Sequence, residues 1–210
     1  MKILCKSRLL PAVRETRLRV ALGEAQASAW RMGAVTLAAG RERAVVDWGD
    51  GSQEEVGGGV TLSHAYARGG EYEIVLSDDI STLSPIGTAE EMLAFAPCYR
   101  SFRSNATLLR GLAARAFQGC VNLATVDCNA SALDTLNPGA FSGCTALPRV
   151  LRLPKLRSLP GPGVLPPFLG CSQIEEIHLS AAHEAEIKSS GAWSRDRTLG
   201  TGRAVVTFDP

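Results

Sequence analysis

The stretch AFQGCVNL at residues 116–123 recurs as AFSGCTAL at residues 140–147, and these two copies decide how the chain is interpreted. Weaker copies of the same Phe-x-x-Cys pattern lie on either side, at residues 95–98 and 168–171. The successive cysteines are 22, 24 and 27 residues apart, which is a spacing typical of short structural repeats. Residues 85–180 are therefore predicted to form repeated units, each packed on the next.

A short apolar stretch compatible with a β-strand follows three of the four cysteines. Its inward-facing positions are predicted to be Leu123, Val126 and Cys128, then Leu147, Leu151 and Leu153, then Ile174, Ile177 and Leu179. The third copy has one more residue between its cysteine and its strand, which predicts a local bulge. The copy around Cys98 shows no comparable strand, so we interpret it either as a cap or as a chance match.

The Ala-Phe-x-x-Cys-x-x-Leu pattern over roughly residues 105–180 resembles the BspA-type leucine-rich repeats. The resemblance implies a right-handed solenoid with one strand per turn, of the kind found in bacterial surface proteins and associated with adhesion. In such a coil the Phe and Cys side chains point inward, where a thiol acts as a small apolar group. A core role, rather than a metal-binding or disulfide role, is therefore predicted for Cys120, Cys128, Cys144 and Cys171. Of the cysteines, only Cys5 is predicted to be exposed.

Residues between the inward positions of these strands should face outward. Asp127, Arg152 and His178 occupy equivalent places in successive strands, so they are predicted to form one polar column. Thr125 and Glu176 are predicted to lie in the neighbouring column. These five residues form either an ordinary solvated surface or a recognition strip, because solenoids commonly bind partners through this face.

The first 84 residues carry a different pattern, with short candidate strands at residues 16–22, 33–39, 44–48 and 71–76 separated by turns rich in Gly or charge. This pattern predicts a small antiparallel sandwich. The motifs VDWGDGS at 46–52 and HAYARGGEYEI at 64–74 resemble the polycystic-kidney-disease (PKD) repeat domain. That family is an immunoglobulin-like β-sandwich found mostly in extracellular proteins.

The Gly-rich turn within VDWGDGS offers two carboxylates, Asp47 and Asp50. An EF-hand counted from Asp47 would need oxygen ligands at its third and fifth positions and Glu at its twelfth. Glycine stands at all three positions, at residues 49, 51 and 58, so the turn is not an EF-hand. A structural turn is the interpretation we favour, and a looser cation site using Asp47 and Asp50 is the alternative.

Residues 181–210 are predicted to cap the repeats. A helix is expected over residues 181–190 with Gly191 ending it, followed by a strand over residues 204–208. Trp193 is expected to cover apolar surface, and His183 to be solvated. The predicted fold class is therefore mainly β, with an immunoglobulin-like sandwich at 1–84, leucine-rich repeats at 85–180 and a small α/β cap at 181–210.

Composition excludes several classes of protein. The 210 residues carry 22 Lys and Arg against 21 Asp and Glu, and this net charge of +1 disfavours nucleic acid as the main partner. No apolar run approaches the length needed to cross a bilayer, so no membrane insertion is expected. Charged residues interrupt every apolar run near the amino end, and we read no export signal there. The chain is expected to stay inside the cell, to leave by a route without a signal peptide, or to lack its natural amino end.

Catalytic motifs are not apparent. The sequence contains no Gly-x-Ser-x-Gly elbow, phosphate loop, His-Glu-x-x-His helix or Cys-x-x-Cys pair, so no enzyme activity, metal or cofactor is predicted. The predicted function is non-catalytic binding or adhesion, with a protein or cell-surface glycan recognised through the strand face. The setting would be a cell surface or a phage-encoded accessory protein. The alternatives are a structural spacer and a carbohydrate-binding module, although Trp30, Trp48 and Trp193 are scattered.

Overall fold

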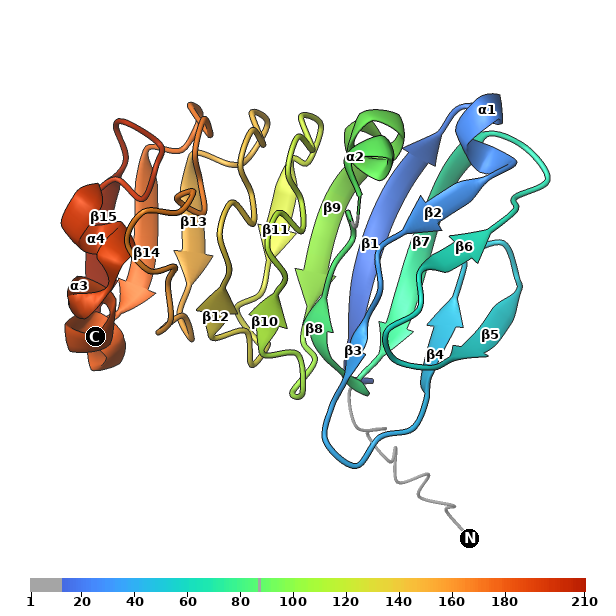
Figure 1. The fold of residues 1–210 in the computed structure, drawn as a ribbon, viewed down its shortest axis with the longest axis horizontal. Coiled ribbons are helices and arrows are strands. Elements are labelled where there is room, and N and C mark those ends of the chain that lie inside the picture. Colours follow the sequence, from blue (N-terminus) through green and yellow to red (C-terminus); the bar gives the residue numbers. More distant parts are fainter. Residues whose placement is uncertain (1–12, 87) are drawn as a thin grey trace, which may run out of the picture.

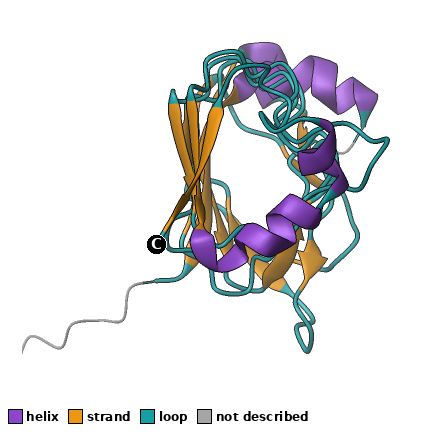
Figure 2. Cartoon of the chain, turned by 90° about the vertical axis from the view of Figure 1, so that its left-hand side faces the viewer, coloured by secondary structure: helices purple, strands orange, loops and turns teal. Residues whose placement is uncertain are grey.

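The computed structural model describes residues 13–86 and 88–210, and its chain is mainly β, with 33% of residues in strands and 13% in helices. The antiparallel strands of the first third lie at one end of the long axis, and from β9 onward the strands of the large sheets follow one another towards the helices near the carboxyl end (Figure 1). Viewed along that axis, longer strands form one side, and loops, helices and short strands form the other (Figure 2).

The elements before the first repeat are β1 (Glu15–Leu22), α1 (Glu24–Ala27), β2 (Trp30–Met32), β3 (Thr36–Leu37), β4 (Ala44–Asp47), β5 (Gln53–Val56), β6 (Leu62–His64), β7 (Gly70–Ser77) and β8 (Ile80–Leu83). The later elements are α2 (Ala89–Phe95), a 3-10 turn (Ala96–Cys98), β9 (Tyr99–Ser104), β10 (Gly111–Leu112), β11 (Thr125–Asp127), β12 (Thr135–Leu136), β13 (Val150–Leu153), β14 (Glu176–Ser180), a 3-10 turn (Ala181–His183), α3 (Glu184–Ser189), α4 (Gly191–Arg195) and β15 (Val205–Asp209).

The largest sheet has six strands in the order β11-β9-β1-β7-β4-β5. β1 is a strand because its sequence alternates: Leu18, Val20 and Leu22 are buried while Arg17 and Arg19 face solvent. β7 runs antiparallel to it along its whole length, from Gly70 opposite Leu22 to Ser77 opposite Glu15. The strands predicted at 16–22, 44–48 and 71–76 are therefore confirmed.

The strand predicted over residues 33–39 is wrong in extent, because only Thr36 and Leu37 form β3. Next to β3, the Val35 carbonyl accepts a hydrogen bond from the Gly59 N–H and not from a paired strand. Within β3, the register with β8 shifts between Thr36 and Leu37. The sequence pattern also missed β2, β5, β6 and β8. In β5, three of the four residues are exposed, so the strand carries no alternation of apolar and polar residues.

The interpretation that no strand follows Cys98 is also wrong, because β9 begins at the next residue. β9 pairs antiparallel with β1 and parallel with β11, so one sheet continues from the amino-terminal strands into the repeats. The other copies have a linker of several residues between cysteine and strand, and the pattern therefore hid this one. Phe95 packs edge-on against Trp30 at 4.9 Å between ring centroids, which ties the first copy to the amino-terminal core.

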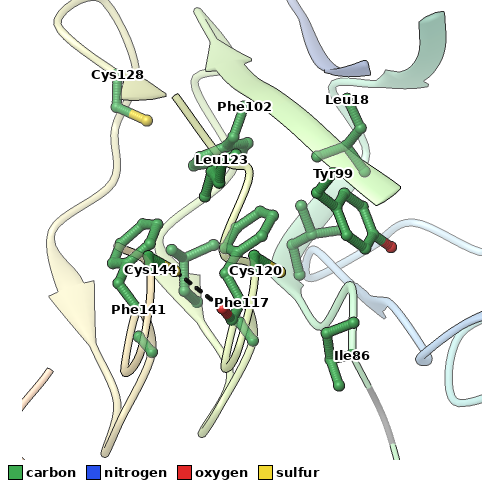
Figure 3. Close-up of a cluster of buried hydrophobic side chains, with 14 of the residues drawn as sticks. Leu18, Ile86, Tyr99, Phe102, Phe117, Cys120, Leu123, Cys128, Phe141 and Cys144 are labelled. Carbon is green, nitrogen blue, oxygen red and sulfur yellow. Dashed lines mark hydrogen bonds between the residues drawn. The ribbon is translucent and has the colours of Figure 1, made fainter. Parts of the chain in front are cut away.

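The Phe and Cys residues of the later copies form a stacked core, and Figure 3 shows Phe117 and Cys120 beside Phe141 and Cys144. The rings of Phe117 and Phe141 lie parallel with centroids 5.4 Å apart, and Phe141 and Phe168 repeat the contact at 5.6 Å. The Cys144 thiol donates to the Phe117 carbonyl over 3.0 Å, and the Cys171 thiol donates to the Phe141 carbonyl over 2.9 Å. Each copy is thus bonded to the one before it.

The predicted burial of the thiols is confirmed. Five cysteines are buried and free of disulfides in the described part of the chain: Cys98, Cys120, Cys128, Cys144 and Cys171. The predicted inward strand positions are also buried, except that Val126 is half-buried. Cys5, predicted to be exposed, lies outside the described residues.

A glycine precedes each of the stacked cysteines, at Gly119, Gly143 and Gly170, and each has a φ between 74° and 77°. A side chain rarely adopts this left-handed conformation, so glycine is favoured at this step. The conformation directs each glycine N–H to a carbonyl of the next copy; for example, Gly119 donates to Ser142 and Gly143 donates to Leu169. The copies are therefore linked by backbone as well as by side chains.

The strands after the cysteines pair in parallel, but not as one continuous ladder. β13, β14 and β15 form a separate parallel sheet, whereas β11 belongs to the six-stranded sheet. The ladder stops between β11 and β13, where the third copy carries its additional residue and Pro148 has no N–H to donate. A second parallel set, β8, β10 and β12, lies across the core and pairs with β3 at its edge.

The carboxyl-terminal segment contains a further copy of the repeat that its sequence conceals. Phe168 donates its N–H to Leu199, and Gly170 donates to Gly200, as earlier copies donate to their successors. β15 then pairs in parallel with β14. The predicted strand is confirmed, with bounds Val205–Asp209. The pattern was missed because Thr201 stands at the position equivalent to Cys171.

The predicted helix over residues 181–190 is a 3-10 turn followed by α3, and Gly191 begins α4 instead of only ending a helix. Ser190 separates the two helices and accepts a hydrogen bond from the Trp193 N–H. Glycine is required at 191 because a Cβ there would lie 2.1 Å from the Pro162 nitrogen. Trp193 packs edge-on against Phe208, which agrees with its expected role over apolar surface.

Candidate binding surface

The outward side chains of the later strands form a surface that we call the strand face. It consists of Arg103 on β9, Asp127 on β11, Arg152 on β13, His178 on β14 and Thr207 on β15. Period-2 alternation orients these side chains, because their strand neighbours are buried in the core, or half-buried in the case of Val126, Val206 and Phe208. Arg103, Asp127 and Arg152 are exposed, whereas His178 and Thr207 are half-buried.

The register divides the strand face into two groups. Arg103 lies directly opposite Asp127 in the six-stranded sheet, and Arg152, His178 and Thr207 are aligned in the other sheet. The structure therefore brings Arg152 and His178 together as the sequence predicted. Asp127 is instead aligned with Arg103, because no hydrogen-bonded ladder joins β11 to β13.

The neighbouring column contains the other two predicted residues, again in separate sheets. Thr125 on β11 is half-buried and aligned with Ser101, while Glu176 on β14 is exposed and aligned with Val150 and Val205. The Glu176 carboxylate contacts His178 in the adjacent column.

His178 has a carboxylate against each ring nitrogen. Nε2 lies 3.0 Å from Glu176 Oε2, and Nδ1 lies 2.9 Å from Asp209 Oδ2. Thr207 Oγ1 lies 3.2 Å from Nδ1, and Arg152 Nη1 is 3.4 Å from Asp209. The hydrogen bonds with Glu176 and then Asp209 raise the pKa of His178, because only the protonated ring can donate from both nitrogens. The cluster fastens β15 to β14.

Two residues of the strand face, Arg103 and Thr207, were not predicted, and neither was Asp209, which contacts His178. Arg103 was missed because β9 was not predicted. Thr207 and Asp209 were missed because aligning them with β14 depends on recognising residues 198–209 as another copy. The signal available in the sequence was weak, namely a Leu-Gly pair at 199–200 that repeats the pair at 169–170.

The turn between β4 and β5 uses both of its carboxylates internally. Asp47 accepts from the Gly49 N–H over 2.9 Å and from Gln53 Nε2 over 2.7 Å, which lowers its pKa. Asp50 accepts from the N–H and hydroxyl of Ser52, and His64 Nε2 lies 2.7 Å from its other oxygen. The geometry favours the structural turn over the alternative cation site.

Ser52, His64 and Asp50 are the residue types of a hydrolytic triad, but their arrangement differs from one. In a triad, the serine contacts one ring nitrogen and the acid contacts the other, so that the acid orients the ring while the histidine accepts the serine proton. Here the same Nε2 faces Asp50 at 2.7 Å and Ser52 Oγ at 3.5 Å. The His64 ring is stacked on Trp48 with 4.9 Å between centroids. The group locks the turn and has no geometry for nucleophile activation.

Across residues 13–86 and 88–210, no three His, Cys, Asp or Glu side chains are grouped so that they could hold a metal ion. In the same part of the chain, none of the helices has the length and apolar character to cross a membrane. Trp30 and Trp48 are fully buried, and Trp193 is half-buried against Phe208. His183, predicted to be solvated, is half-buried and lies 3.3 Å from Glu186.

Comparison with protein-family models, curated proteins and solved structures found no match for this chain.

Proposed function

We propose that this protein is a non-catalytic binding protein that contacts a protein or a cell-surface glycan through the strand face. Under this proposal the chain combines a PKD-like immunoglobulin-type sandwich with BspA-type leucine-rich repeats, and it acts at a cell surface or on a phage particle. The stacked Phe rings and buried Cys side chains support the repeat assignment, because that pattern requires both residues to lie in the core.

The observation that carries the proposal is a set of exposed charges on strands whose inward side chains are buried or half-buried in the core. Arg103 and Asp127 project from one sheet and Arg152 projects from another, and strand pairing holds the backbone of each. A rigid platform with fixed charged groups lowers the entropy lost when a partner binds. Alternating charges also favour partners of complementary pattern over others.

Two alternatives receive less support. A carbohydrate-binding module of the aromatic type needs exposed rings on which sugars stack, but Trp30 and Trp48 are buried and Trp193 packs on Phe208. An enzyme needs a nucleophile or base aimed at a substrate, and the Ser52–His64–Asp50 group lacks that geometry. We therefore infer a binding role rather than catalysis.

The proposal is tested with a glycan array and a biosensor panel of purified extracellular glycoproteins. The face variant Arg103→Ala/Asp127→Ala/Arg152→Ala is compared with the control variant Arg31→Ala/Glu42→Ala/Arg68→Ala, which removes the same charges from exposed positions elsewhere. His178 is left intact because it fastens β15. We expect a probe that binds the natural chain and the control but loses at least tenfold affinity for the face variant. Binding that survives in the face variant, is lost equally in the control, or is found for no probe would contradict the proposal.

A further inference from the structure

A second row of polar residues lies in the turns beside the short strands β10 and β12, across the core from the longer strands. Arg110 precedes β10, Asp134 precedes β12, and Arg157 precedes the bridge that Ser158 makes to Thr135. Backbone hydrogen bonds align the three residues, since the Asp134 N–H donates to the Arg110 carbonyl and the Arg157 N–H donates to the Asp134 carbonyl, both over 2.9 Å. Arg110, Asp134 and Arg157 therefore lie side by side in successive copies of the repeat.

Asp134 holds the two arginines without using most of their donors. Its Oδ2 lies 3.4 Å from Arg110 Nη1 and 3.5 Å from Arg157 Nη2, while its Oδ1 accepts from the Thr135 hydroxyl over 2.8 Å. The Asp134 side chain is 11% exposed, but the two arginine side chains are 60% and 54% exposed. Each guanidinium has five N–H donors, so both retain donors directed to solvent.

These arginines line a concave site of about 560 Å³. Lys155 and His183 also line it, together with Thr107 and with Ser131, which is buried and whose hydroxyl donates to the Cys128 carbonyl. Among the described side chains, Lys155 has no ion pair in the structure, so three permanent cations face one carboxylate. Other charges stand at its margin: Glu186 pairs with His183, while Arg14 and Asp78 both contact Thr107. The pocket carries an excess of positive charge.

We propose that this pocket binds an anionic sugar, a saccharide that carries sulfate or carboxylate groups. Arg110 and Arg157 would grip its acidic groups, since guanidinium forms paired hydrogen bonds with such anions. Lys155 would add charge, and the remaining guanidinium N–H donors of the two arginines would meet sugar hydroxyls. The volume lies within the range of ligand pockets and suits more than one inorganic ion.

The lining favours a sugar over other anionic partners. It contains no Phe, Tyr or Trp ring and no large apolar side chain, which an acidic peptide would use as an anchor and a nucleic acid base would use for stacking. The site lies beside β10 and β12 and shares none of the strand-face residues. A test of binding at this pocket is therefore independent of the function proposed for the strand face.

Titration calorimetry with two tetrasaccharides tests the site and separates the two anion sources. One arm uses a heparin-derived, sulfated tetrasaccharide, and the other uses a hyaluronan tetrasaccharide that carries only carboxylates. We expect at least one of them to bind, with affinity that falls as salt rises. Arg110→Gln/Arg157→Gln should weaken that binding at least tenfold. Arg43→Gln/Arg149→Gln removes two arginines elsewhere that are more exposed and are likewise paired with a carboxylate, and it should change the affinity less than twofold.

Two more variants distinguish a ligand site from a structural ion-pair network. Asp134→Asn removes the carboxylate that competes for the arginines, so it should tighten binding several-fold. Arg103→Ala/Asp127→Ala/Arg152→Ala should leave the affinity unchanged. The inference is overturned if neither tetrasaccharide binds, if both arginine pairs have the same effect, if the strand-face variant abolishes binding, or if single-stranded DNA binds the pocket as tightly as the sugar.

Discussion

The ring of Phe141 lies on the ring of Phe117 at an interplanar angle of 4°, and the thiol three residues after Phe141 donates to the Phe117 carbonyl. Two adjacent copies of the repeat are thus joined by a ring contact and by a hydrogen bond from the same rung. Phe168 and Cys171 repeat the arrangement on Phe141. The Phe-x-x-Cys spacing therefore fixes how one turn sits on the next, and with it where the outward charges lie.

Substitution of the stacked glycine should destabilise the repeats. Gly143→Ala places a side chain at φ 77°, where an L-residue costs about 1–2 kcal/mol. Gly161→Ala is the matched control, because Gly161 has no such conformation and its added Cβ would meet no atom within 4 Å. Urea unfolding measures both variants. Equal free energies of unfolding for the two variants would contradict the role assigned to Gly119, Gly143 and Gly170.

The buried thiols should resist modification in the folded protein. Burial raises the pKa of Cys171 to about 12, and burial likewise raises the pKa of Cys98, Cys128 and Cys144. Because the thiolate is the reactive species, these groups should react slowly with a disulfide reagent near pH 8. In a Cys5→Ser background, we expect reaction of all five described thiols only in urea. Rapid labelling of Cys144 or Cys171 in the native protein would show that these thiols are accessible to solvent, contrary to the structure.

The His178 cluster predicts a pH-dependent attachment of the last strand. The folded pKa of His178 is raised above 6.5, so its stabilising effect is complete below that pH and is lost as the pH rises through the folded pKa. The carboxylates are about half exposed, so the effect should stay below about 1 kcal/mol. The natural chain should be less stable at about pH 8.5 than at about pH 5.5, and His178→Gln should flatten this dependence. An unchanged slope in His178→Gln would exclude His178 as its source.

Asp50 predicts the opposite pH dependence in the amino-terminal part. Burial alone would raise the pKa of Asp50, but hydrogen bonds from Ser52 and His64 outweigh burial and lower it to about 2. Its contribution is present at neutral pH and is lost as the pH falls from about 4 towards 2. Thermal unfolding across that interval should show a smaller loss for Asp50→Asn than for the natural chain. A larger loss in the variant would contradict the assignment.

The sequence predicted those parts of the fold that repeat or alternate. The Phe and Cys rungs recur in recognisable form, and β1 shows period-2 burial along its length, so both were found. β9 was missed because its first residue follows Cys98 directly, without the linker of the other copies. The last copy was missed because Thr201 replaces the cysteine, although its backbone pairs in the same way.

The candidate sites were predicted less completely than the fold, because they depend on contacts between turns. Arg152 and His178 could be aligned from their places in equivalent strands. Asp209 reaches His178 only through the pairing of β14 with β15, which no local pattern specifies. The Arg110–Asp134–Arg157 row is of the same kind, since its members are more than 20 residues apart and meet only when the copies stack.

The stacking of adjacent rungs is the claim on which the other inferences depend, and a double-mutant cycle tests it most directly. Phe117→Leu, Phe141→Leu and their combination should reveal a coupling of about 0.5–1.5 kcal/mol in the free energy of unfolding, as expected for rings in contact. The same cycle for Phe117 and Phe168, which the Phe141 ring separates, should give less than about 0.5 kcal/mol. No coupling between Phe117 and Phe141, or equal coupling in both cycles, would contradict the stacked arrangement.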